Sequence, residues 1–446
     1  MEDLDKNFSL SSLYVEEISG ISSLFHNHKR NLPIFILNRK IYSNFKVDEI
    51  HKNHLLINNS TNLEEFKEDH GLFSYHKLKK YGIDTPGAIQ IIAHNLKIPE
   101  NWIGYSGLKD SQAITNQLIS IWSPTGKPYR NLDFERIQLS RGITSKFELN
   151  FGDLIGNQFN IILDSKNQIT NEEKIEISNL MNSIQKKGIP NYFGTQRFGS
   201  IRPISHLIGK ALLRSDWKLA ALSYLVISTN LEQDYIQNTR FELSSSLNFK
   251  NFIISIPKKF HYEKRIANEL IKTNNYQKAI FSVPKKILSL FIASYQSFIF
   301  NWILSKFLTN FNAFDTKLEN IPLIGYETDF NEYPEWVNRD IEEILKEDKI
   351  NLHNFNQKES WIKISGSKRK AIIYPRDFKF KIYSNRMNLE FSLNKGSYAT
   401  SLIREIVNNR KNVENRMISD QIYKNYNKKA IQFFIFPENC KSLFNL

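Results

Sequence analysis

Residues 102–122 have the sequence WIGYSGLKDSQAITNQLISIW, in which a glycine-containing turn divides two apolar segments. In the second segment, residues 118–122 alternate between the two faces of an extended chain, a pattern typical of a β-strand. We therefore predict a strand, a loop at residues 107–112 and a second strand. The loop carries Lys109 and Asp110, and two flanking strands would hold it stiffly, as a catalytic group requires.

The acidic residue of this loop has two interpretations. Aspartate is common in turns because its side chain bonds to nearby backbone, so Asp110 needs no catalytic role to be there. The alternative is a catalytic carboxylate whose loop receives hydrogen bonds from Thr115 and Gln117. The residues alone leave both interpretations open.

Strand and helix patterns alternate on both sides of the loop. Alternating side chains predict strands at residues 45–50, 156–164 and 388–393. Helical spacing with caps predicts helices at residues 85–96 (capped by Thr85, with Pro86 in the first turn), 171–187 (capped by Thr170 or Asn171) and 397–407, and mostly helical structure at 205–310. The chain therefore leaves a strand-rich domain, builds a helical one and returns.

Basic residues outnumber acidic ones, with 60 lysines and arginines against 46 aspartates and glutamates and a net charge of +14. Such an excess favours a polyanionic partner, because each neutralised phosphate releases condensed counterions. The basic residues are spread along the chain and do not form a polybasic block beside a membrane anchor. We therefore expect a nucleic acid as the partner, and no membrane.

Cysteine usage and hydropathy bear on the compartment. Cys440 is the only cysteine, and the first ten residues, MEDLDKNFSL, lack the apolar core of a signal peptide. We therefore expect a cytoplasmic protein, and a monomer. Residues 287–304 lack charge over about the length that spans a bilayer, but they include serine, glutamine and asparagine, which favours a buried helix.

The segment NYFGTQRFG at residues 191–199 combines aromatic, amide and arginine side chains around glycines. It suits a turn with packed phenylalanines, or equally an RNA-facing loop in which Phe193 stacks and Asn191 or Arg197 donates hydrogen bonds.

Metal and nucleotide sites are not favoured by the sequence. The histidine pairs at residues 26 and 28 and at residues 51 and 54 lack a third ligand at a recognisable spacing. GYSGLKDS has the wrong glycine-to-lysine spacing for a phosphate-binding loop. We expect no metal and no cofactor.

Several segments, in order, resemble the motifs of the TruD family of tRNA pseudouridine synthases, especially its longer archaeal and eukaryotic branch. GYSGLKDSQAITNQ looks like the motif around the catalytic aspartate, PNYFGTQRFG like the second signature, and GSYATSLIREI like the closing motif. RPISHLIGKALL, YQSFIFN and IPLIGYETDF are similar to insertion-side segments of the longer members. The likeness covers residues 39–408.

The resemblance implies an α+β fold, namely a pseudouridine synthase catalytic domain with a mixed, mostly antiparallel sheet that is interrupted by a TRUD insertion domain. The expected parts are a variable lead-in at 1–38, catalytic segments at 39–215 and 373–408, the insertion domain at 216–372, and a carboxy-terminal extension at 409–446.

The resemblance also implies an activity, the conversion of uridine to pseudouridine in tRNA, at position 13 in most of the family, without cofactor or metal. Asp110 becomes the catalytic residue, which attacks or deprotonates the ribose side of the nucleotide. A neighbouring cation keeps such a carboxylate ionised, and Arg39 is the first choice for it, with Arg197 second. The alternative function is a non-catalytic basic RNA-binding protein on the same fold.

The remaining site residues follow from the motifs. Phe45 matches the family's base-stacking phenylalanine, Asn191 matches a substrate-contacting asparagine, and Tyr398 falls where the family commonly has phenylalanine. Phe193 and Arg197 complete the expected substrate-binding set. A pocket of this kind suits a base flipped out of its stack, because stacking and hydrogen bonds offset the few kcal/mol that flipping costs.

Two departures from the family pattern stand next to these residues. Ser111 replaces the basic residue that usually follows the catalytic aspartate, and YSNF, which ends at Phe45, replaces the usual lead-in Pro-Glu-Asp-Phe.

Overall fold

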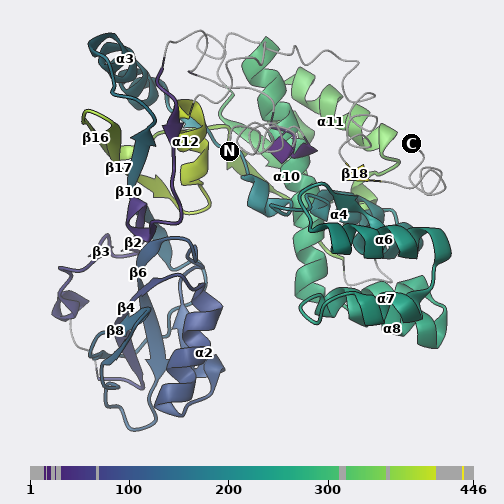
Figure 1. The fold of residues 1–446 in the computed structure, drawn as a ribbon, viewed down its shortest axis with the longest axis horizontal. Helices are drawn as coiled ribbons and strands as arrows, with labels where there is room; N and C mark the ends of the chain where they lie inside the picture. The colour runs from purple at the N-terminus through teal and green to yellow at the C-terminus, as the bar shows by residue number, and fades with distance from the viewer. Residues whose placement is uncertain are drawn as a thin grey trace. The chain divides into compact units, whose positions relative to one another are not determined.

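A computed structural model describes residues 15–16, 18–21, 26, 32–66, 70–310, 318–357, 362–407 and 434–435. The chain forms two compact units, each built from separate stretches (Figure 1). The sheet unit comprises residues 26–189 and 373–411, and the helical unit comprises residues 1–25, 190–372 and 412–446. The lead-in and the carboxy-terminal extension expected from the sequence lie mostly outside the described residues.

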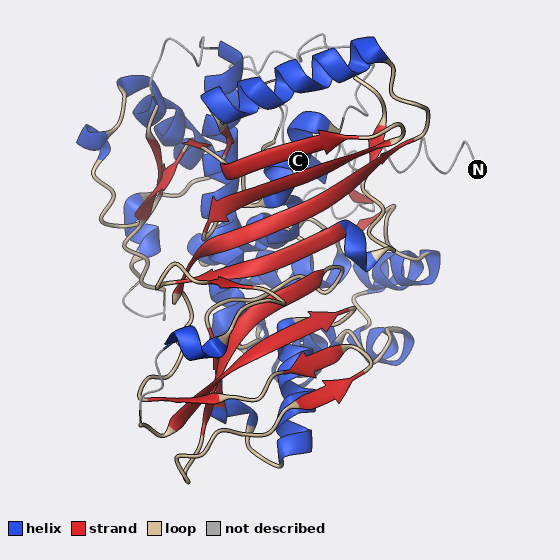
Figure 2. Cartoon of the chain, turned by 90° about the vertical axis from the view of Figure 1, so that its left-hand side faces the viewer, coloured by secondary structure: helices blue, strands red, loops and turns tan. Residues whose placement is uncertain are grey.

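The sheet unit is organised around one sheet of twelve strands within the described residues (Figure 2). Its main path runs β16-β17-β10-β2-β6-β4-β8-β7, and β1, β3, β5 and β9 pair with β10, β2, β6 and β4. The parallel pair is β2 with β6, and the other pairs are antiparallel. The expected mixed, mostly antiparallel sheet is therefore confirmed.

The strands of this sheet have the following bounds: β1 Phe35–Ile36, β2 Phe45–His51, β3 Leu56–Ile57, β4 Phe73–Tyr81, β5 Ile103–Tyr105, β6 Ile114–Trp122, β7 Leu132–Phe134, β8 Ile137–Leu139, β9 Ile143–Ser145, β10 Leu154–Ser165, β16 Arg376–Ile382 and β17 Arg386–Asn394. Three-residue or four-residue 3₁₀ helices lie at η1 Tyr42–Asn44, η2 Leu63–Phe66 and η3 Glu100–Trp102. The strand, loop and strand predicted around Asp110 correspond to β5, the loop at residues 106–113 and β6.

Helices α2 (Thr85–Leu96), α3 (Asn171–Lys187) and α12 (Ala399–Ile406) pack on this sheet (Figure 1). Apolar side chains of α3 and α12 form one core with β2, β10 and β17, and those of α2 form another with β4 and β6. Thr170 caps α3 in a capping box with Glu173, which the sequence predicted as one of two options.

The predicted cap of α2 is wrong by one residue. The N-cap is Asp84, whose carboxylate accepts a hydrogen bond from Gly87 N at 2.9 Å. Thr85 lies inside the first turn, and its hydroxyl bonds to the loop that carries Asp110. Either side chain has the chemistry of a cap, and the tertiary partner of Thr85 decides between them.

The helical unit contains α4 Ser205–Leu213, α5 Trp217–Val226, α6 Asp234–Ser246, α7 Phe249–Ser255, α8 His261–Thr273, α9 Tyr276–Phe281, α10 Lys285–Asn310 and α11 Glu335–Glu347. Short strands pair β12 (Ser228–Thr229) with β18 (Phe434–Ile435), β13 (Asn320–Leu323) with β14 (Ser367–Lys370), and β11 (Ile189–Pro190) with β15 (Ile372–Ile373). The 3₁₀ helices are η4 Thr195–Arg197, η5 Phe330–Glu332 and η6 Leu352–Phe355. The expected helical character of residues 205–310 is confirmed.

Helix α10 is the uncharged stretch noted in the sequence. Among the described residues it is the one helix long and apolar enough to cross a membrane, and most of it is buried inside the protein. Its polar side chains bond to backbone: Asn301 donates to the carbonyls of Ser19 and Phe193 at 2.9 and 3.0 Å, and Gln296 donates to Ile324 O at 2.6 Å. The predicted buried helix is confirmed.

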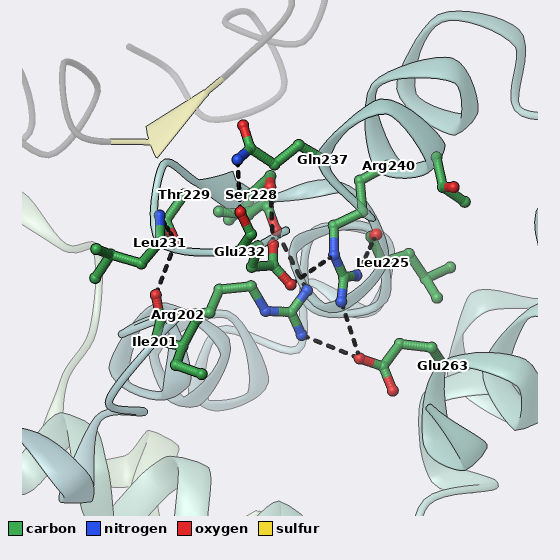
Figure 3. Close-up of polar contacts among 12 residues, drawn as sticks. Ile201, Arg202, Leu225, Ser228, Thr229, Leu231, Glu232, Gln237, Arg240 and Glu263 are labelled. Atoms are coloured by element: carbon green, nitrogen blue, oxygen red, sulfur yellow. Dashed lines mark hydrogen bonds and ion pairs between the residues drawn. The ribbon is translucent and has the colours of Figure 1, made fainter. Parts of the chain in front are cut away.

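A buried arginine, Arg240, and a mostly buried one, Arg202, join α5, α6 and α8 in the helical unit (Figure 3). Arg202 and Arg240 each contact one carboxylate oxygen of Glu263 at 3.2 Å, and Arg240 also pairs with Glu232 at 3.2 Å. Other donors of the two arginines reach carbonyls at the end of α5, at residues 224 and 225, and the carbonyl of its C-cap residue 227. The cluster balances two positive with two negative charges and satisfies the carbonyl end of a helix.

Candidate active site

Asp110 forms an ion pair with Arg39 in the sheet unit. Arg39 Nη1 lies 2.6 Å from Asp110 Oδ2, and the two side chains are 22% and 26% exposed. The guanidinium also lies over the ring of Phe45, with Cζ 4.0 Å from the ring centroid. The structure thus brings together Arg39, Phe45 and Asp110, which come from the segment before β2, the start of β2 and the loop before β6.

Phe45 is less accessible than a stacking platform would be. Its side chain is 3% exposed, and its ring edge packs against Phe159 with centroids 6.1 Å apart. Because the guanidinium covers the ring, a base could stack on Phe45 only after the side chain of Arg39 moved. In the present arrangement the planar guanidinium is the exposed surface of this stack.

Side chains from α2 and β6 hold the loop of Asp110 by hydrogen bonds. Thr85 in α2 accepts from Lys109 N at 3.0 Å and donates to Gln117 Oε1 at 3.0 Å. Gln117 in β6 donates to Gly107 O at 3.3 Å. Within the loop, Asp110 Oδ1 accepts from Gln112 N at 2.9 Å, which fixes one carboxylate oxygen and leaves the other for Arg39.

The expectation for the supporting side chains is half right. Gln117 bonds to the loop as predicted. Thr115 is buried, but its hydroxyl has no hydrogen-bond partner among the described residues. It lies on the same face of β6 as Gln117, with Val47 of β2 as its register partner.

A buried ion pair lies beneath the loop. Lys109 Nζ is 2.5 Å from Glu49 Oε2, with side chains 3% and 0% exposed, and Glu49 Oε1 accepts from Leu118 N at 3.3 Å. Glu49 lies in β2 and Leu118 in β6, so the pair joins the loop to the parallel strand pair. The sequence pattern predicted neither this pairing of Lys109 nor a role for Glu49.

A second lysine, which the sequence analysis also missed, supports the loop from β4. The buried Lys80 donates to the carbonyls of Ile83, Lys109 and Asp110 at 2.9, 3.3 and 3.1 Å. Burial lowers the pKa of its ammonium to about 8, whereas Asp110 and Asp84 act in the opposite direction. The sequence feature that could have predicted this role is a lysine at an inward-facing position of a strand, where charged residues are rare.

The predicted residues of the second motif lie together in the helical unit. Asn191 is 4% exposed, its amide donates to Lys370 O at 2.9 Å, and its Oδ1 accepts from Arg369 Nη2 at 2.7 Å. The guanidinium of Arg369 lies 4.0 Å from the ring centroid of Phe193, and that of Arg197 lies at 5.8 Å. Arg369, from β14, is a member of this group that the sequence analysis did not identify.

Tyr398 belongs to the sheet unit and is half-buried at the N-cap position of α12, where its side chain makes no capping hydrogen bond. The predicted residues therefore form two groups, one around Asp110 and one around Asn191, with Tyr398 at the start of a helix.

The histidines considered as metal ligands have other partners. His26 contacts Ser183 Oγ at 3.0 Å and Gly188 O at 2.5 Å, and His51 contacts Asn53 Oδ1 at 2.9 Å. His28 lies outside the described residues. Within the part of the chain that the structure describes, no three His, Cys, Asp or Glu side chains gather as metal ligands would.

Comparisons with known proteins agree on one family. The chain matches the family model described as tRNA pseudouridine synthase D (TruD) over residues 34–320 and 318–406. A relative from Methanococcus vannielii named "Probable tRNA pseudouridine synthase D" is 30% identical over 348 residues, which cover 76% of this chain and 86% of the relative. One of the same name from Methanosarcina barkeri is 27% identical over 400 residues, covering 78% and 90%.

The fold also has a counterpart among solved structures. A crystal structure of a Methanosarcina mazei protein described as "Putative tRNA pseudouridine synthase D (TruD)" superposes with a TM-score of 0.69. The alignment covers 88% of this chain and 97% of that one, at 24% sequence identity. This likeness shows the α+β fold.

Proposed function

The chain belongs to the TruD family of tRNA pseudouridine synthases, and from this membership we infer that it isomerises uridine to pseudouridine in tRNA. The reaction detaches uracil from C1′ of the ribose, rotates the base and rejoins it through carbon. It balances without an external oxidant, reductant or group donor, which agrees with the expected absence of a cofactor. Position 13 of tRNA, the target implied by the resemblance, is the proposed site of modification.

Asp110 is the proposed catalytic residue, and its pairing with Arg39 is the observation that carries the proposal. The pair keeps a negative oxygen at a partly exposed position while the loop behind it is bonded to α2, β4 and β6. A charged carboxylate in a preorganised loop suits both attack on the ribose and removal of a ribose proton. Both routes begin from the same ionised Asp110.

The other predicted residues are proposed to bind the nucleotide. Arg39 would lie against the flipped base or its phosphate, because the guanidinium combines a planar surface with five donors. Phe45 would support that plane from below. Asn191, Phe193 and Arg197 would contact RNA from the helical unit, and Tyr398 would do so from the start of α12.

The decisive test is the substitution Asp110→Asn, which keeps the size of the side chain and removes its charge. Tritium release from tRNA labelled at C5 of uridine should fall by about 10²–10⁴-fold or more, because the nucleophile or base is lost. Asp133→Asn, at an exposed position in β7, is the matched control and should keep the wild-type rate. A variant Asp110→Asn that retained the wild-type rate would refute the site.

Mapping of pseudouridine in tRNA from a strain lacking the gene tests the activity and its target together. Loss of pseudouridine at position 13 is the expected result. Unchanged modification, together with tight tRNA binding by the pure protein, would instead support a non-catalytic RNA-binding protein.

Domain roles, location and assembly complete the proposal. We propose that the sheet unit is the catalytic domain and that residues 216–372 within the helical unit are the TRUD insertion domain. The protein is proposed to act in the cytoplasm as a monomer, which multi-angle light scattering of the pure protein would test.

A further inference from the structure

Lys80 is a buried charged group whose position the proposed reaction does not yet explain. It lies in β4, is fully buried, and directs Nζ at the loop of Asp110. Two of its three acceptors are the carbonyls of Lys109 and Asp110, and the third is the carbonyl of Ile83, just before α2. All three donors of the ammonium are thus used on backbone oxygens.

Burial of an ammonium without a paired carboxylate is unfavourable, because backbone carbonyls replace only part of its hydration. An apolar residue at this inward-facing strand position would avoid that cost. In this position the ammonium links two carbonyl oxygens of the loop, those of Lys109 and Asp110, to β4 of the sheet. Hydrogen bonds from a charged donor are roughly twice as strong as neutral ones, so these bonds from Lys80 oppose rotation of the Asp110 peptide.

Charged groups surround the ammonium of Lys80 on more than one side. The groups that face the ammonium are Asp110 and Lys109 in the loop and Asp84 at the cap of α2. The charge of Lys109 is met by Glu49, and Arg39 meets the carboxylate of Asp110 from the other side. Asp110 therefore lies between two positive groups, of which one contacts its side chain and the other its main chain.

We propose that Lys80 is a positioning residue for the isomerisation, whose ammonium fixes the Asp110 peptide and thereby keeps the carboxylate oriented for the reaction. This inference rests on the proposed function, because it assigns Lys80 a role through Asp110. Lys80 itself does not contact the substrate.

The first test is Lys80→Met, which keeps the length of the side chain and removes the charge and its donors. We expect kcat to fall by about 10- to 100-fold, because small misplacements of a catalytic group have effects of that size. KM for tRNA should change by less than about threefold, since Lys80 does not bind RNA. The matched control is Lys79→Met, the adjacent residue of the same strand, whose side chain points to the opposite face.

The pH profile separates positioning from a merely structural role. The ammonium is protonated below pH 8, so kcat/KM of the wild type should be level near pH 7 and fall as the pH rises through about 8. Lys80→Met should lack this alkaline decline and stay at its low rate throughout. Lys80→Arg, which keeps the charge, should recover part of the rate and move the decline to higher pH.

The outcomes distinguish this inference from the proposed function. If the wild type is active and Lys80→Met keeps kcat within about twofold, or shows the same alkaline decline, the role of Lys80 is refuted while Asp110 stands. If Lys80→Met does not fold, the wild-type profile still decides, since a level kcat/KM up to pH 9.5 refutes it. An inactive wild type would refute the proposed function itself.

Discussion

At the scale of residues, the candidate site depends on how one carboxylate is shared. One carboxylate oxygen of Asp110 accepts a hydrogen bond from Gln112 N, and the other pairs with Arg39. Together these two contacts fix the orientation of the carboxylate. The guanidinium is itself held by the ring of Phe45. Phe45 therefore positions Arg39, and Arg39 in turn positions the carboxylate of Asp110.

Arg39→Met tests this chain of contacts. We expect kcat/KM to fall by about 10- to 1000-fold, because the carboxylate loses its orienting partner. The free energy of unfolding should change by less than about 1 kcal/mol, because ion pairs with this degree of exposure contribute little to stability.

Arg386→Met is the control for Arg39→Met, since Arg386 pairs with Asp164 at 3.6 Å in the same unit with side chains 51% and 33% exposed. It should change neither quantity. Equal losses of activity in both variants would contradict a specific role for Arg39, and tritium release with urea unfolding measures both quantities.

At the scale of elements, the sequence predicted the strands around Asp110 and the helices α2, α3 and α12, because alternation, helical spacing and caps are local signals. The loop contacts were not predictable in the same way. Lys80, Glu49 and Lys109 come together only once β2, β4 and β6 are paired. In the ion pair, Glu49 and Lys109 are 60 residues apart in the sequence. A single sequence records that a lysine is inward-facing but not which carbonyls it will meet.

The lack of tertiary information in the sequence also explains why Thr85 was predicted as the cap of α2 in place of Asp84. The local pattern allows both as the cap of α2, and only the position of the loop shows that Thr85 is needed there. Arg369 was missed for a related reason, because the β13–β14 pair brings it to Asn191 from 178 residues away.

Removal of the α2 cap gives a prediction at this scale. Asp84→Ala should lower the free energy of unfolding by about 1 kcal/mol, the usual effect of losing a cap. It should also shift the alkaline decline of kcat/KM to lower pH, because Asp84 is one of the charges that raise the pKa of Lys80. Thermal unfolding and the pH profile measure the two effects.

Thr170→Ala is the matched control for Asp84→Ala, because it removes the side-chain cap of α3 without removing a charge. The two variants should lose similar stability, and the pH profile of Thr170→Ala should match the wild type. A shifted profile in both would show that stability, and not the charge of Asp84, controls the decline.

At the scale of the whole molecule, different interactions stabilise the two units. The sheet unit contains three apolar clusters among the described residues, whereas α5, α6 and α8 of the helical unit share the cluster of Arg202, Arg240, Glu232 and Glu263 (Figure 3). Burial lowers the pKa of Arg202 to about 10, which still leaves it charged at neutral pH. Loss of one carboxylate would leave a buried charge with fewer partners.

Glu263→Gln should therefore lower the stability of the helical unit by about 3–5 kcal/mol, the usual effect of breaking a buried ion pair. Hydrogen–deuterium exchange should show lost protection in α5, α6 and α8, with the sheet unit unchanged. Glu332→Gln, which breaks an exposed pair with Lys368 in the same unit, is the control and should have little effect. Lost protection spread evenly over both units would contradict independent support.

The side chains bonded to the Asp110 loop come from residues 49, 80, 85 and 117, and the ion-pair partner of Asp110 is residue 39. During synthesis this whole set leaves the ribosome before residue 190, the first residue of the long segment of the helical unit. The side chains that hold the proposed catalytic loop thus all lie in one continuous part of the amino-acid sequence, residues 39–117. Changes of length between residues 190 and 372 during evolution would leave that part intact.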